Sequence, residues 1–171
     1  HAPRIKQTIN TKLVQLSKKC SWAGNENGVQ FLQWAADMHE IGIDIAHSQH
    51  HKHSAYVIEN GDLAGFSRQD QQILATIVRS QRRKFSPALF MHLPVLWSTE
   101  AVSLTLILRL AILLHRNRAD QLLPSFKITM SKVKISLKFA AGWLAQSPLT
   151  HADLTQEAEY LKAAGYKLEF C

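Results

Sequence analysis

Cysteine and glycine are scarce in this 171-residue sequence, and their scarcity excludes several kinds of site. The two cysteines, Cys20 and Cys171, form neither a disulfide framework nor the paired spacing of a zinc site, which fits a reducing cytoplasm. The seven glycines stand singly and provide no phosphate-cradling loop. No Gly-x-Ser-x-Gly motif occurs either, so the residues offer no recognisable nucleophilic active site.

The sequence also lacks a long apolar run. Its most apolar stretch, residues 102–114, is too short to span a bilayer and contains Arg109. We expect a buried helix over about 99–117, in which Arg109 needs a partner because an unpaired buried charge is costly. No signal peptide is visible. The chain begins with His1 rather than Met, which we interpret as a cut inside a longer protein or the remnant of a tag.

Positive charge, by contrast, is in excess. The formal net charge is +7, and apolar residues make up 46% of the chain, enough for the core of one compact domain. A basic excess favours a polyanionic partner such as nucleic acid, polyphosphate, a nucleotide or an anionic membrane surface. The alternative is a basic surface with no specific partner. We expect no specific nucleic acid, since no RNA-stacking motif, zinc finger or helix-turn-helix signature occurs, and at most a peripheral membrane contact.

Apolar residues recur with helical spacing over the first two thirds of the chain. We expect helices over about 5–20, 29–46, 53–60, 67–79 and 99–117. Lys12 falls on the solvent side of the first, and the histidine-rich residues 47–52 fall in a turn. Gly42 permits a close approach or weakens its helix, Gly61 suits a left-handed helix end, and Ser67 is a good N-cap.

After Pro124 the apolar residues alternate with period two. This predicts strands over 126–130 and 133–139 joined by a tight turn, a helix over about 149–164, and a third strand over 166–170. The expected fold is therefore mainly α, with a helical bundle over residues 1–122 and a small ββαβ (α+β) module over 123–171.

Five of the nine histidines lie between residues 31 and 67, where metal binding, phosphate binding and a purely structural role all stay open. His-Glu at 39–40 lacks the second histidine of the His-Glu-x-x-His pattern, which excludes that class of metalloprotease. The weak metal candidates are His39, Glu40, His51 and His53. The phosphate candidates are cationic and could gather where helix ends meet: Lys52, Arg79, Arg82, Arg83, Lys84, Arg116 and Arg118.

Four segments, in order, resemble the C-terminal half of the exopolyphosphatase / guanosine pentaphosphate phosphohydrolase family. They are AADMHEIGIDIAHSQHHKHSAYVIENGDLAGFS, LATIVRSQRR, LILRLAILLHRNRAD and GWLAQSPLT. HKHSAYVIEN followed by DLAGF favours the exopolyphosphatase branch, whereas RLAILLHRNRAD is compatible with both branches.

The resemblance implies a cytoplasmic homodimeric hydrolase whose phosphate-cleaving site and magnesium lie in N-terminal actin-like domains absent from this chain. It also implies that residues 1–122 form an HD-like domain, that 123–171 form a small α/β domain, and that this half binds polyphosphate in a basic channel. The sequence departs from true HD phosphohydrolases, because His39-Glu40 stands where His-Asp is expected and Arg109-Leu-Ala111 where a metal-binding Asp is expected. Both departures oppose a catalytic HD site.

The leading hypothesis is the polyphosphate-binding and dimerisation portion of an exopolyphosphatase, inactive and without a cofactor as an isolated chain. One alternative is the corresponding portion of a guanosine pentaphosphate phosphohydrolase. Two others are a degenerate HD domain with residual metal-dependent phosphohydrolase activity, and a structural module that docks the missing domains.

Overall fold

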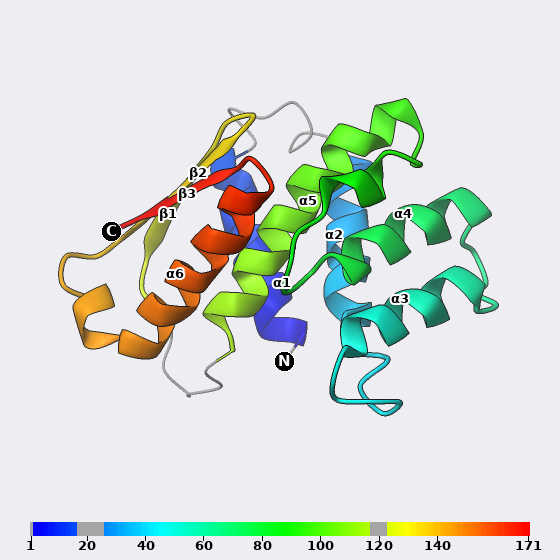
Figure 1. The fold of residues 1–171 in the computed structure, drawn as a ribbon, viewed down its shortest axis with the longest axis horizontal. Coiled ribbons are helices and arrows are strands. Elements are labelled where there is room, and N and C mark those ends of the chain that lie inside the picture. The colour runs from blue at the N-terminus through cyan, green and yellow to red at the C-terminus, as the bar shows by residue number, and fades with distance from the viewer. Residues whose placement is uncertain (1, 17–25, 117–122) are drawn as a thin grey trace.

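A computed structural model describes residues 2–16, 26–116 and 123–171 of the chain (Figure 1). Its helices are α1 (Ala2–Leu16), α2 (Glu26–Met38), α3 (His50–Asn60), α4 (Arg68–Arg79), α5 (Val95–Leu114) and α6 (Pro148–Ala163), with short 3-10 helices η1 (Pro87–Phe90) and η2 (Leu144–Gln146). Its strands are β1 (Phe126–Met130), β2 (Lys134–Phe139) and β3 (Lys167–Phe170). The predicted mainly α, α+β class is confirmed.

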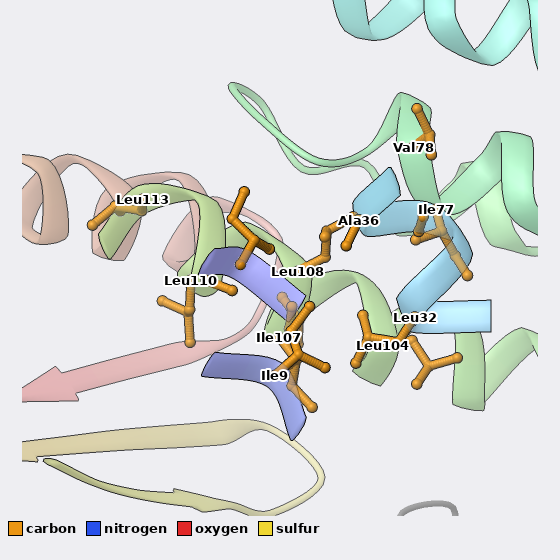
Figure 2. Packing of buried hydrophobic residues seen from close by; sticks show 14 of the residues in the cluster. Ile9, Leu32, Ala36, Ile77, Val78, Leu104, Ile107, Leu108, Leu110 and Leu113 are labelled. Atoms are coloured by element: carbon orange, nitrogen blue, oxygen red, sulfur yellow. The ribbon is translucent and has the colours of Figure 1, made fainter. Parts of the chain in front are cut away.

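Helix α5 is the centre of the structure and contacts α1, α2, α4 and α6. In Figure 1 it runs between the sheet with α6 on one side and α2, α3 and α4 on the other. By length and composition α5 could also cross a membrane, with a mean hydropathy of 1.6. Eleven of its residues are buried, and Figure 2 shows Leu104, Ile107 and Leu108 packed among side chains of α1, α2 and α4. The expected buried helix is thus confirmed.

The sheet has the order β1-β2-β3, with β1 and β2 antiparallel and β2 and β3 parallel. Alternate residues such as Phe126, Ile128, Ile135 and Leu137 point into the core, as the period-two pattern predicted. Helix α6 makes the crossover from β2 to β3, which completes the ββαβ order. Buried residues from both sides of position 122 belong to one hydrophobic cluster, and the division into two domains there stays a prediction.

Several predicted boundaries were wrong, and tertiary contacts explain the first of them. Helix α2 was expected to reach residue 46 but ends at Met38. The carbonyl of His39, which a continuing helix would bond to the N–H of Ile43, instead accepts hydrogen bonds from the side chains of Ser54 and Gln81. The N–H of Ile43 donates to Glu40, and the chain turns.

The chain then enters α3 earlier than expected, at His50 rather than residue 53, so the predicted turn over 47–52 is only half right. Helix α5 likewise begins at Val95, because the carbonyl of Pro94 accepts the first helical bonds from Trp97 and Ser98. Gly61 is extended rather than left-handed, with φ −71°. A Cβ there would lie 2.5 Å from the carbonyl oxygen of Val57, so close approach explains this glycine.

Two further expectations concern single side chains. Lys12 was expected in solvent but is buried, because its Nζ donates to the carbonyl of Phe126 and lies 3.8 Å from that ring's centroid. Burial lowers the pKa of the Lys12 ammonium. Ser67 is the predicted N-cap and forms a reciprocal capping box with Asp70. Cys20 and the other residues of 17–25 lie outside the described residues, and α2 begins at Glu26, before its predicted start at residue 29.

Gly42 provides the expected close approach between the turn after α2 and helix α3. A Cβ at Gly42 would lie 2.4 Å from the backbone nitrogen of Ser54 and 2.8 Å from the carbonyl oxygen of His50. Both atoms belong to the backbone and cannot rotate away.

We therefore predict that Gly42→Ala lowers the free energy of unfolding by about 3 kcal/mol or more, because helix α3 must shift. The matched control is Gly65→Ala, where φ is +86° and a Cβ meets nothing within 4 Å. That change should cost only the backbone strain of about 1–2 kcal/mol. Urea denaturation of both variants measures the difference, and equal costs would contradict the close packing at Gly42.

Candidate functional site

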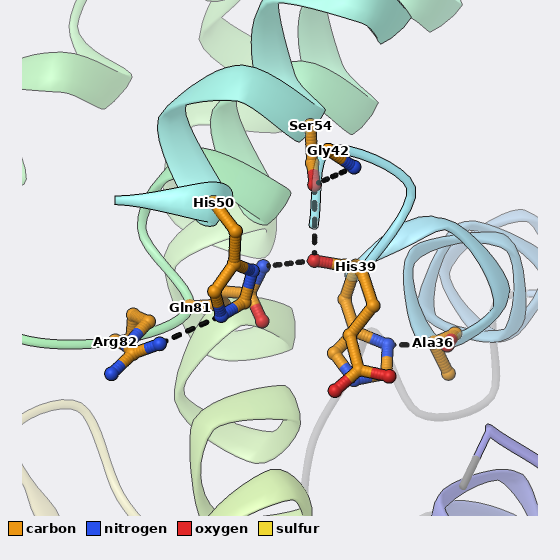
Figure 3. A network of polar contacts seen from close by, with 8 residues as sticks. Ala36, His39, Gly42, His50, Ser54, Gln81 and Arg82 are labelled. Atoms are coloured by element: carbon orange, nitrogen blue, oxygen red, sulfur yellow. Dashed lines mark hydrogen bonds and ion pairs between the residues drawn. The ribbon is translucent and has the colours of Figure 1, made fainter. Parts of the chain in front are cut away.

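The carbonyl of His39 joins three segments that are distant in the sequence (Figure 3). It accepts from Ser54 Oγ on α3 at 3.2 Å and from Gln81 Nε2, just after α4, at 2.7 Å. Ser54 Oγ in turn accepts from the N–H of Gly42 at 2.9 Å. Because Gln81 is only 2% exposed, this network fixes the chain immediately before Arg82 and Arg83.

Arg82 is held against α3 by His50. Its Nη1 lies 2.7 Å from His50 Nε2, and since arginine can only donate, His50 Nε2 is the acceptor (Figure 3). Neutral His50 therefore carries its proton on Nδ1. Burial lowers the pKa of His50, and the Arg82 charge lowers it further. The pair presents the Arg82 guanidinium at the N-terminal end of α3.

His51 lies in the same cationic surroundings and is 5% exposed. Burial, followed by the charges of Arg82, His50, Lys52 and Arg83, lowers the pKa of His51 to about 4. Burial also lowers the pKa of Arg82, as do the neighbouring Arg83 and Arg116 charges, which Tyr160 opposes. Lys52, Arg82, Arg83 and Arg116 thus share one positive region, called here the basic surface.

Residues 80–84, which carry Arg82 and Arg83 of this surface, are anchored by Arg109. The guanidinium of Arg109 is 2% exposed and donates from Nη1 to the carbonyl of Ser80 at 2.7 Å and from Nη2 to the carbonyl of Arg83 at 2.6 Å. Its Nε and Nη2 also donate to the two carboxylate oxygens of Glu157 on α6, at 2.5 and 3.0 Å. The partner that Arg109 was predicted to need is therefore Glu157.

The structure brings together only some of the predicted phosphate ligands. Lys52, Arg82, Arg83 and Arg116 contribute to the basic surface, although Arg116 also donates to Asp153 at 3.1 Å. Arg79 and Lys84 are exposed close by in sequence, whereas Arg118 lies outside the described residues. The sequence pattern does not reveal Gln81, Ser54 or Glu157, because their hydrogen bonds span 42, 15 and 48 residues of the chain.

Of the predicted metal candidates, His39 is held by contacts within the fold. His39 is buried, its Nδ1 donates to the carbonyl of Ala36 at 2.7 Å, and its Nε2 lies 3.7 Å from Glu40. Among residues 2–16, 26–116 and 123–171, no three His, Cys, Asp or Glu side chains gather as metal ligands, and this holds for His51 and His53 too. This donor set does not fit magnesium, which takes carboxylate and phosphate oxygens.

An open groove of about 830 Å³ lies apart from the basic surface. It is lined by η1, the first half of α5 and the hairpin between β1 and β2, through residues including Phe90, Val102 and Leu106. Met91 and Val95 line it as well, and these two side chains are 82% and 88% exposed. Its lining is mainly apolar, so it suits protein contact better than phosphate.

The fold and the site together define an α+β domain that presents cations beside buried histidines. Comparison with protein families then makes the assignment specific, since the family described as "Ppx/GppA phosphatase, domain III" matches residues 1–158. The chain belongs to the Ppx/GppA phosphatase family. The resemblance inferred from the sequence is therefore confirmed.

Individual relatives bear the name guanosine-5'-triphosphate,3'-diphosphate pyrophosphatase. The protein from Pseudoalteromonas translucida is 34% identical over 83% of this chain and 28% of its own length. Those from Aliivibrio fischeri and Pseudoalteromonas atlantica are each 32% identical, over 95% and 98% of this chain and 33% of their own lengths. The chain thus spans about a third of the length of these relatives. Their name is that of the guanosine pentaphosphate branch, whereas the sequence favoured the exopolyphosphatase branch.

The lowered histidine pKa values predict how stability depends on pH. An unfolded histidine with its ordinary pKa near 6.5 binds a proton that folded His51, with a pKa of about 4, does not bind. The loss of stability therefore begins as pH falls below about 6.5 and continues toward 4, whereas pH above 7 has no effect through this group.

Thermal unfolding at pH 7.5 and at pH 5 measures this effect. We expect the loss of stability between these two pH values to be smaller in His51→Gln than in the wild type, by an amount on the order of 1 kcal/mol, or about 2–4 °C in Tm. Exposed His92 provides the matched control, because His92→Gln should leave the slope unchanged. Parallel slopes for wild type and His51→Gln would show that His51 is not buried as described.

Proposed function

We propose that this chain is the phosphate-binding portion of a Ppx/GppA-family phosphohydrolase and that its basic surface holds the phosphate chain of the substrate. Hydrolysis belongs to the two thirds of the relatives that this chain does not span. The isolated chain is then a binding module, and the magnesium that the resemblance implies acts outside its described residues.

The observation that carries this proposal is the gathering of like charges around His51. Lys52, Arg82 and Arg83 all disfavour its protonation, and Arg82 Nη1 lies 2.7 Å from Nε2 of the neighbouring His50. Like charges repel, and a phosphate chain between them would remove the repulsion while accepting paired hydrogen bonds from the arginines. An anion at this place would also lie beside the positive N-terminal end of α3.

Two ligands share the required chemistry. Inorganic polyphosphate is the ligand of the exopolyphosphatase branch that the sequence favoured, and the names of the relatives point to guanosine pentaphosphate. Both present consecutive phosphates. Titrating the chain in parallel with long-chain polyphosphate, with guanosine pentaphosphate and with GTP separates them: preference for the first supports the exopolyphosphatase branch, and preference for the second supports the relatives' activity.

Charge reversal tests the basic surface. We predict that Arg82→Glu/Arg83→Glu weakens polyphosphate binding by more than about tenfold, or ~1.4 kcal/mol, because two attractive contacts become repulsive. The dependence of log affinity on log salt concentration should flatten by about one unit for each cation that no longer pairs with a phosphate. Isothermal titration calorimetry at low and at physiological salt measures both quantities.

The matched control is Lys127→Glu/Lys138→Glu, which changes two exposed cations opposite each other on β1 and β2. Both double variants lower the formal net charge from +7 to +3. Equal decreases in affinity in the two variants would mean that overall charge, rather than the basic surface, attracts the polymer. Unchanged affinity in Arg82→Glu/Arg83→Glu would remove this surface from the proposal.

The exposed apolar side chains around the groove favour a second, docking function. Met91, Val95 and Leu96 are each more than 80% exposed and lie close together in sequence, where α5 begins. Exposed apolar patches of this kind mark protein interaction sites. We propose that this face forms the expected homodimer contact.

Sedimentation velocity tests the docking function directly. The wild-type chain should dimerise as its concentration rises, and Leu96→Glu should be monomeric because it places a charge in the contact. Ile45→Glu, at a residue 59% exposed in the turn between α2 and α3 and away from the start of α5, should still dimerise. A wild-type chain that stays monomeric at every concentration would contradict this role.

A further inference from the structure

We infer that Arg109 and Glu157 are positioning residues, which hold residues 80–84 in the one conformation that presents Arg82 and Arg83 to a phosphate chain. This inference rests on the proposed function. It adds that the ββαβ module, which carries Glu157, determines the conformation of the basic surface. Neither residue touches the ligand. They act through the backbone that carries the two arginines.

Helix α6 contributes three polar residues to this arrangement from a single face. Asp153, Glu157 and Tyr160 are separated by four and three positions, so they lie along one side of the helix. Asp153 bonds Arg116, Glu157 bonds Arg109, and Tyr160 acts on the charge of Arg82. The ββαβ module therefore contacts the basic surface directly at Arg116 and reaches residues 80–84 through Arg109.

The backbone of residues 80–84 needs such anchoring because one residue is held in an unfavourable conformation. Arg83 has φ +61°, in the left-handed region that side chains other than glycine rarely adopt. Such strain persists where surrounding contacts fix it, and it is concentrated at functional sites. Here the carbonyl of Arg83 accepts from Arg109, and the carbonyl of Ser80 accepts from the same guanidinium.

Gln81 adds a third attachment, to the carbonyl of His39. Arg82 is thus flanked on both sides by fixed residues, and its own Nη1 is bonded to His50. The contacts leave part of Arg82 and the Arg83 side chain exposed to a ligand, on a backbone that is held in place. Rigid presentation favours binding because less conformational freedom is lost when the ligand is ordered.

Two carboxylates on α6, those of Asp153 and Glu157, make it possible to distinguish a positioning role from a purely electrostatic effect on binding. Asp153 competes with any anion for Arg116, so its removal should strengthen binding. Glu157 also carries a negative charge beside the basic surface, so a purely electrostatic account predicts that its removal strengthens binding as well. If Glu157 positions residues 80–84, its removal must weaken binding instead.

The experiment compares Glu157→Gln with Asp153→Asn in the 171-residue chain, with long-chain inorganic polyphosphate as the titrant in calorimetry. Each variant removes one negative charge from the same face of α6. We expect Glu157→Gln to weaken binding about tenfold because the arginines are no longer held in place. We expect Asp153→Asn to strengthen binding about two- to fivefold because exposed ion pairs are weak competitors.

A second variant guards against general unfolding, since Glu157→Gln leaves the buried Arg109 without its counterion. Arg109→Met/Glu157→Met replaces the pair by apolar side chains of similar length, which cores commonly tolerate. It should retain the cooperative unfolding of the wild type and still bind polyphosphate about tenfold more weakly. Hydrogen exchange should rise at residues 80–84 and not in α1 or α2.

Coupling gives the decisive readout. In an Arg82→Ala/Arg83→Ala background, the further change Glu157→Gln should no longer weaken binding, because there is nothing left to position. Stronger binding in Glu157→Gln, or an equal decrease in both backgrounds, would overturn the positioning role. The proposed function would fail differently, through unchanged affinity in Arg82→Glu/Arg83→Glu.

Discussion

The structure depends on a guanidinium buried inside its most apolar helix. Arg109 lies in the second half of the core helix α5, with 2% of its surface exposed. A charge in such a place must be paired and its donors satisfied. Glu157 supplies the counterion, and the carbonyls of Ser80 and Arg83 accept the remaining bonds. One side chain thereby connects the central helix, the end of α4 and the ββαβ module.

This connection explains why the basic surface lies where it does. Replacing a buried ion pair by apolar residues is often neutral or stabilising, so stability alone gives little reason for the pair. The Arg109–Glu157 pair instead determines position. It places α6 beside residues 80–84, and the arginines of that segment lie next to α3. The histidines contribute as neutral, buried groups, since His50 accepts from Arg82 and the pKa of His51 is lowered to about 4.

The sequence predicted the parts of this arrangement that depend on local pattern. Alternation of apolar residues located the strands, Ser67 located the start of α4, and the apolar surroundings of Arg109 required a partner. The parts that failed depend on contacts across the chain. The end of α2 is set by Ser54 and Gln81, which lie 15 and 42 residues from His39. Nothing in the periodicity of α6 distinguished Glu157 from the exposed Glu159 beside it.

Membership of the Ppx/GppA phosphatase family and the arrangement of the basic surface support the same account, in which this chain holds phosphate for chemistry performed elsewhere in a longer protein. The most direct measurement is a crystal structure of the chain with tripolyphosphate. The account predicts phosphate oxygens within hydrogen-bonding distance of Arg82 and Arg83, with Arg83 still at a positive φ. Phosphate bound instead along the lysines of β1 and β2, with the Arg82 surface empty, would contradict it.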